Sequence, residues 1–210
     1  MNWELIHRWN SVVIGLFIVA HLGVHLFAVA SPEAHAGAAG VLRQYYRDPL
    51  LEVILLSSLL IQIVSGYAEL KLFVKPGWRL VRNLSGLYLI AFMALHVGTV
   101  MYARHIDHVP TDFYWAAGAF ALEPLRYGAM GFYGLGVFSF FTHMIAVCAL
   151  TWKSMPRSVL MIFWSVAIII TTLILLAFSG LLYKLDIPMS VIGYYEAVLA
   201  QLPFISPYTQ

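Results

Sequence analysis

Five long apolar stretches, separated by short polar segments, dominate the pattern of this chain. They cover approximately residues 9–30, 50–67, 84–103, 127–152 and 159–182. Each approaches or exceeds the ~20 residues that a helix needs to cross about 30 Å of hydrocarbon. Because a segment in lipid must satisfy its own backbone hydrogen bonds, all five are predicted to be helices. The pattern predicts an all-α integral membrane protein built as a five-transmembrane-helix bundle.

The connecting segments predict a bundle with two different ends. Pro76-Gly77 and Pro156 indicate short turns on one side, whereas segments 31–48 and 105–126 on the other side are long enough to cap the bundle. Residues 190–202 are expected to form a short helix along the interface on that second side. We therefore divide the chain into a membrane domain, 1–183, and a C-terminal segment, 184–210.

The first stretch has a second interpretation. Ala28-Val29-Ala30 resembles a signal-peptidase site behind a short apolar core. His21 and His25 are unusual in such a core, and little positive charge precedes it. We expect the stretch to be retained as the first helix.

Composition supports a membrane protein and excludes some functions. The chain is 61% hydrophobic and only 10% charged, against about 25% charged residues in soluble domains. The net charge of +2 gives no indication of nucleic-acid binding. A single cysteine, Cys148, excludes an internal disulfide and any cysteine-ligated cluster within the chain.

The distribution of positive charge indicates an orientation. Seven of the 12 lysines and arginines lie on the side of the N-terminus and of the short turns. Since cytoplasmic loops are enriched in these residues, we expect the N-terminus in the cytoplasm and the C-terminus outside, in a bacterial inner membrane.

Three histidines lie deep inside separate apolar stretches. Ionisable residues in the membrane are functional candidates, and several histidines together suggest a redox metal, for which we expect haem iron. His21 lies thirteen residues after Arg8, and His96 fourteen after Arg82, so both are about 20 Å along co-oriented helices. His21 and His96 therefore form a depth-matched pair of candidate axial ligands. His143, on a descending helix, lies lower, at about 15 Å.

The remaining histidines have other expected roles, and the buried ones have an alternative interpretation. His25 is one turn beyond His21 on the same face, where it would contact a haem propionate, line a quinone pocket or replace His21 as the ligand. We interpret His35, His105 and His108 as solvated. The alternative for the buried histidines is hydrogen bonding between packed helices.

Several motifs carry a resemblance to a known family. They are His7-Arg8-Trp9-Asn10-Ser11 leading to His21-Leu22, Arg82-Asn83-Leu84-Ser85-Gly86 leading to His96-Val97, Gly134-Leu135-Gly136-Val137 leading to His143, and the pairs Leu51-Glu52 and Ser65-Gly66. In this order they resemble the membrane-anchor cytochrome b subunit of succinate:quinone oxidoreductases and quinol:fumarate reductases, in its single-chain five-helix form. The resemblance covers about residues 5–183.

The resemblance implies an electron-transfer role. Such subunits bind two haems b, pass electrons between membrane quinone and partner iron–sulfur clusters, and dock a flavoprotein and an iron–sulfur subunit on the cytoplasmic side. The outer haem carries over to His21 and His96. The inner haem carries over to His143 and a position on the second helix, near Gln62 or Ser65, where this chain has no histidine. One haem is therefore expected and a second is open. FAD and iron–sulfur clusters belong to the partners, which would perform the tricarboxylic acid cycle chemistry on succinate or fumarate.

Losing the inner haem would leave a quinone near the cytoplasmic surface as the acceptor. Candidate contacts are the polar residues at or below the level of His143, because hydrogen-bond donors stabilise charge on quinone oxygens. They are Arg8, Ser11, Gln62, Arg82 and Ser85. The alternative is that the arginines only reach the headgroups and the serines only allow close helix packing.

Three other functions remain to be distinguished. One is a cytochrome b subunit of another quinone-linked complex, such as a hydrogenase or a formate dehydrogenase. A second is a haem-free anchor or transporter whose histidines relay protons or only pack. A third, a membrane di-iron oxygenase suggested by the spacing of His21 and His25, is disfavoured because the further histidine clusters it needs are missing.

Overall fold

The computed structural model describes residues 1–71 and 75–201, and every regular element in these ranges is a helix. Five are long and apolar enough to cross a membrane: α1 (Trp3–Phe27), α3 (Pro49–Ala68), α4 (Trp78–His105), α6 (Leu125–Thr151) and α7 (Arg157–Phe178). Three are shorter: α2 (Pro32–Tyr46), α5 (Phe113–Gly118) and α8 (Met189–Ala200). The predicted all-α fold, with five helices long and apolar enough to cross a membrane, is confirmed in the described residues.

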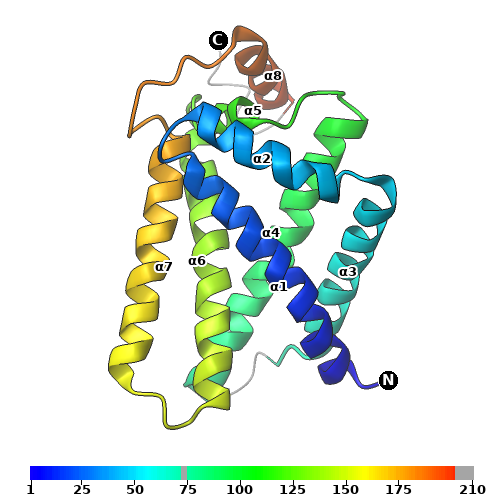
Figure 1. The fold of residues 1–210 in the computed structure, drawn as a ribbon, viewed down its shortest axis with the longest axis vertical. Helices are drawn as coiled ribbons and strands as arrows, with labels where there is room; N and C mark the ends of the chain where they lie inside the picture. The colour runs from blue at the N-terminus through cyan, green and yellow to red at the C-terminus, as the bar shows by residue number, and fades with distance from the viewer. Residues whose placement is uncertain (72–74, 202–210) are drawn as a thin grey trace.

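The long helices alternate in direction and stand side by side, with the short helices gathered at one end (Figure 1). We call this end, covered by α2, α5 and α8, the covered end, and the opposite one, where the chain begins, the N-terminal end. α1 packs against α3, α4 packs against α6, and α6 packs against α7. In the described residues, α1 and α4 are not among the extensively packed pairs, although α1 crosses in front of α4 (Figure 1).

Side-chain caps explain where several helices begin. The Ser31 hydroxyl accepts a hydrogen bond from the Ala34 amide at 3.1 Å at the start of α2. The carboxylate of Asp48 accepts from the amides of Leu50 and Leu51 at the start of α3. Such residues satisfy amides that have no partner within the helix. The polar segment 31–48 therefore contains a helix, α2, between two helices long enough to cross a membrane.

The helices extend beyond the apolar stretches at several ends. α1 starts at Trp3 rather than near residue 9, and α4 starts at Trp78 rather than near residue 84, because helices continue into the interfacial region with tryptophan and arginine side chains. In contrast, residues 28–30 form a turn outside α1. α7 ends at Phe178 rather than near residue 182, because Gly180 follows with a φ of 72°, a conformation that glycine adopts without strain.

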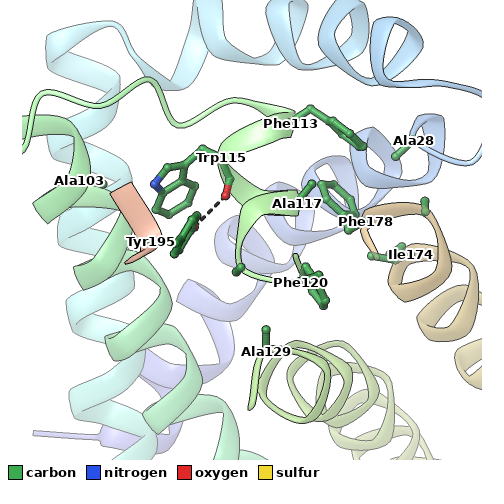
Figure 2. Packing of buried hydrophobic residues seen from close by; sticks show 12 residues of the cluster. Ala28, Ala103, Phe113, Trp115, Ala117, Phe120, Ala129, Ile174, Phe178 and Tyr195 are labelled. Atoms are coloured by element: carbon green, nitrogen blue, oxygen red, sulfur yellow. Dashed lines mark hydrogen bonds between the residues drawn. The ribbon is translucent and has the colours of Figure 1, made fainter. Parts of the chain in front are cut away.

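A buried aromatic cluster joins the helices at the covered end (Figure 2). Phe113 of α5 stacks on Phe178 of α7 with ring centroids 4.9 Å apart. Tyr195 of α8 donates a hydrogen bond from its hydroxyl to the Trp115 carbonyl at 2.7 Å. The predicted C-terminal helix is therefore present and packs on α5.

Large apolar side chains remain exposed along the membrane helices. Leu16 of α1 is 69% exposed, Leu95 of α4 60% and Ile169 of α7 57%. Contiguous apolar surface of this kind is not stable against water. The exposed apolar side chains therefore suit contact with membrane lipid and support the predicted multi-pass character.

Candidate functional site between α1 and α4

His21 of α1 and His96 of α4 face each other across the bundle. Their ring centroids are 6.2 Å apart with an angle of 54° between the ring planes. Two imidazoles sharing one metal through bonds of about 2 Å, each with its ring centre about 1 Å further back, have centroids roughly 6 Å apart. The centroid spacing of the pair therefore matches that of two imidazoles that would bind one iron.

Aromatic rings hold both imidazoles in place. Phe17, one turn before His21, stacks on it with centroids 5.6 Å apart and a 16° interplanar angle. Phe92, one turn before His96, does the same at 5.3 Å and 5°. Tyr133 of α6 packs edge-on against His96 at 5.8 Å. This packing reduces the rotational freedom of the two rings, as a ligand pair requires.

His25 links His21 to the covered end. Its Nε2 lies 3.1 Å from Nε2 of His21, and its Nδ1 lies 3.2 Å from Nε2 of His35 on α2. The expectation that His35 is solvated is wrong, since it is only 4% exposed and packs against Phe113 and Phe178. Burial of its imidazole follows from the fold of α2 over the end of α1, which the local sequence does not encode.

His35 has a perturbed pKa outside the membrane-spanning helices. Burial lowers the pKa of this imidazole from 6.5 to about 4, helped by the positive charge of Arg43, while Asp112 acts in the opposite direction. His35 is therefore neutral at pH 7, with one ring nitrogen donating and the other accepting. A neutral ring suits the observed contact with His25.

Two details bear on whether haem fits this pair. Nε2 of His21 is the atom that contacts His25, so iron held by that nitrogen would take the place of this hydrogen bond. Nδ1 of His96 is buried without a partner in the described residues, and a polar atom of this kind is costly to leave unpaired. Among these residues no group of three or more metal-ligating side chains gathers. Two axial imidazoles alone suit a metal whose other ligands come with it, as in a porphyrin.

His143 lies at a second level, nearer the N-terminal end. Its Nδ1 donates to the Arg82 carbonyl of α4 at 3.0 Å, and Ser85 Oγ is 3.4 Å away. Because a carbonyl only accepts, the proton sits on Nδ1 and Nε2 carries a lone pair. Gly86 of α4 leaves room for the His143 ring, since a Cβ at this position would lie 3.2 Å from that ring.

His7, which sequence reasoning did not place in a site, joins Gln62 and Ser65 of α3. Nδ1 of His7 is 3.1 Å from Ser65 Oγ, and Nε2 of Gln62 is 3.2 Å from His7 Nε2. Asn10 donates to Gln62 Oε1 at 2.7 Å. The only sequence signal was the motif position of His7 before Arg8. Gln62 and Ser65 thus hydrogen-bond to residues of the neighbouring helix α1, and their expected position opposite His143 stays a prediction.

The remaining quinone candidates separate into two groups. Arg82 and Ser85 lie beside His143, and the Arg82 guanidinium donates to Asn83 Oδ1 at 2.9 Å. Arg8 is exposed, and Ser11 donates to its carbonyl at 2.7 Å within α1. The Arg82 carbonyl and the Ser85 hydroxyl both contact His143, whereas the contact recorded for Ser11 is with the Arg8 carbonyl.

Comparisons of the chain with protein-family models, curated proteins and solved structures find no match. The chemistry of the site therefore rests on its own residues. The upper level offers two neighbouring imidazoles for one metal, and the lower level offers a hydrogen-bond acceptor on His143 beside the Ser85 hydroxyl.

Proposed function

We propose that this chain is the membrane anchor and quinone-reactive cytochrome b subunit of a succinate dehydrogenase or fumarate reductase complex. His21 and His96 would be the axial ligands of one haem b. The observation that carries the proposal is the 6.2 Å spacing of their rings. The family motifs along the five helices support the choice of complex.

The residues around the pair would bind and orient the cofactor. The haem supplies reversible one-electron chemistry. Phe17 and Phe92 fix the imidazole planes through stacking, and Tyr133 closes the α6 side of His96. These apolar rings exclude water from the ligands, and a dry, low-dielectric surrounding is one way in which proteins set haem potential.

The lower level would receive the quinone. Nε2 of His143 would accept a hydrogen bond from a quinol hydroxyl, because its Nδ1 proton is already given to the Arg82 carbonyl. Ser85 and the guanidinium of Arg82 provide donors for a quinone oxygen once they leave their present partners. No dicarboxylate chemistry is assigned to this chain, since that reaction belongs to the flavoprotein partner.

The partners would dock at the N-terminal end. Among the described residues the short helices α2, α5 and α8 all lie at the other end (Figure 1). The excess of lysine and arginine at the N-terminal end favours the cytoplasm of a bacterial cell, where the flavoprotein and iron–sulfur subunits would reside.

Affinity purification from native membranes tests this function. A tag on the chain should retrieve a complex with stoichiometric flavin, iron–sulfur signals and a b-type haem spectrum, active with succinate and quinone. Arg82→Ala together with Ser85→Ala should impair quinone turnover and leave haem content unchanged, whereas Ser11→Ala should leave both unchanged. A complex without flavin, or unchanged quinone kinetics in the double variant, contradicts the proposal.

A haem-free anchor or transporter is the second candidate. The contacts from His21 through His25 to His35 form one continuous series of imidazoles that leads from the bundle to the covered end. Such a series favours proton relay when no metal occupies His21. A reduced-minus-oxidised spectrum of the purified chain distinguishes the two functions.

A further inference from the structure

Two arginines of α2 converge on one point at the covered end. Arg43 and Arg47 are one helical turn apart, so their side chains leave the same face. Nη2 of Arg43 donates to the Thr111 carbonyl at 2.8 Å, and Nη2 of Arg47 donates to the Thr111 hydroxyl at 3.0 Å. One residue of the connection between α4 and α5 thus holds both guanidinium groups side by side.

Most of the hydrogen-bonding capacity of these arginines is unused. The Nε atoms of both are buried and have no partner in the described part of the chain. Ion pairs in that part join Arg104 to Glu52 and Lys184 to Asp186, and none involves Arg43 or Arg47. The two residues are half-buried, and like charges held close together without an ion-pair partner repel each other. The pair therefore has the character of a site for an anion.

The arginine pair lies close to the histidines. Tyr46, on the same helix, packs edge-on against Phe17 with centroids 5.8 Å apart, and Phe17 stacks on His21. The charge of Arg43 also reaches His35, where it helps burial to lower the pKa to about 4. His35 in turn stacks on His25. These contacts connect α2, which carries both arginines, to His21 and His25 of α1.

We propose that Arg43 and Arg47 form an oxyanion-binding site that holds a pair of carboxylate or phosphate groups at the covered end. The haem propionates are one source of these anions, and this source rests on the proposed function. The phosphate of an anionic phospholipid is the other source and does not depend on haem.

The chemistry of arginine favours this ligand class. The Nε–H and one Nη–H form a planar fork that matches a carboxylate or phosphate in two parallel hydrogen bonds. Haem carries two propionates, which matches two such forks. Positive charge beside the porphyrin stabilises the reduced iron, so the pair would raise the midpoint potential of the haem.

The test compares the full-length chain with its Arg43→Gln/Arg47→Gln variant. Protein from haem-limited cells is titrated with haem and, separately, with haem dimethyl ester, in which both carboxylates are masked. A parallel arm measures how much phosphatidylglycerol, relative to phosphatidylcholine, each form retains after detergent washing. Arg43→Lys keeps the charge without the fork, and Lys184→Gln removes an exposed charge at the same end. Circular dichroism checks that each variant is folded.

The propionate source predicts that the double variant binds haem at least tenfold more weakly and with a lower midpoint potential. Binding of the dimethyl ester should be the same in wild type and variant, and Lys184→Gln should resemble wild type. The lipid source predicts unchanged haem behaviour and a loss of retained phosphatidylglycerol. A wild type that binds no haem refutes the proposed function and leaves the lipid arm to decide. Unchanged haem binding together with unchanged lipid retention overturns the oxyanion site.

Discussion

At the scale of single residues, one glycine controls the packing around His96. A Cβ at Gly136 of α6 would collide with the ring of Phe92, which stacks on His96. Gly136→Ala should therefore displace Phe92, cost about 1–3 kcal/mol of stability through overpacking and reduce haem retention. Haem per chain and the thermal midpoint in detergent measure both effects.

Gly131→Ala is the matched control for this prediction. It lies on the same helix, and a Cβ there meets nothing within 4 Å. We expect it to retain wild-type haem content and stability. Equal behaviour of the two variants would show that the contact between Phe92 and His96 does not matter for the site.

The lowered pKa of His35 predicts that the stability of the fold depends on pH. Its pKa is about 4 in the folded protein, against 6.5 when unperturbed. Between these values the unfolded chain binds more protons than the folded one, so stability falls as the pH drops through this window. His35→Asn should flatten the decline of the thermal midpoint between pH 7 and pH 4.5. His105→Asn, at an exposed position, should leave the wild-type slope, and an equally steep slope in His35→Asn would contradict the prediction.

Residue-level inference succeeded where one helix alone fixes the position. The helical rise and the co-orientation of two spans were enough to predict that His21 and His96 would be level, and their rings do face each other. The burial of His35 and the contacts of His7 were missed, because they depend on α2 folding back over α1 and on the packing of α1 against α3. The occupancy of the site by haem stays a prediction.

At the scale of elements, an ion pair joins α3 to α4 near the covered end. Arg104 Nη1 is 2.5 Å from Glu52 Oε1, and the two side chains are 17% and 18% exposed. Removing one partner leaves a mostly buried charge alone, so Glu52→Gln should cost about 2 kcal/mol, within the range for charged hydrogen bonds. Thermal unfolding in detergent measures the loss.

A double-mutant cycle with Arg104→Gln isolates the pair energy. Lys184→Gln breaks a solvent-exposed pair and should leave the thermal midpoint unchanged. If Glu52→Gln is as harmless as Lys184→Gln, the pair does not stabilise the contact between α3 and α4.

The docking of α8 on α5 depends on Gly118. A Cβ there would lie 2.6 Å from both Val191 and Tyr195, so Gly118→Ala should push α8 away and expose it to protease. A Cβ at Gly193, on α8 itself, would meet nothing within 4 Å. Gly193→Ala should therefore leave α8 resistant to protease. Limited proteolysis followed by mass spectrometry distinguishes them, and equal cleavage rates would count against this docking.

Hydropathy predicted the long elements well and the short ones poorly. The five spans follow from apolar length alone, because lipid leaves the backbone no alternative to a helix. The segments that became α2 and α5 were expected only to cap the bundle, because short helices mixing polar and small residues give no distinctive periodicity. Their caps at Ser31 and Asp112 become evident once the chain direction on either side is known.

At the scale of the whole molecule, the protein has a polar and aromatic interior within an apolar exterior. Exposed leucines, isoleucines and valines cover the outer faces of the five membrane helices, whereas the histidines line their inner faces at two levels. Burying imidazoles inside a lipid-facing bundle costs free energy unless hydrogen bonds or metal ligation offset it. The proposed cofactor-binding role requires an arrangement of this kind.

The haem-to-protein ratio tests the central claim most directly. It should be measured by reduced-minus-oxidised spectroscopy on the intact chain isolated from its native host. The account predicts about one b-type haem per chain in wild type, none in His96→Ala and an unchanged amount in His143→Ala. A colourless wild type, or a His96→Ala variant that keeps its haem, would contradict it.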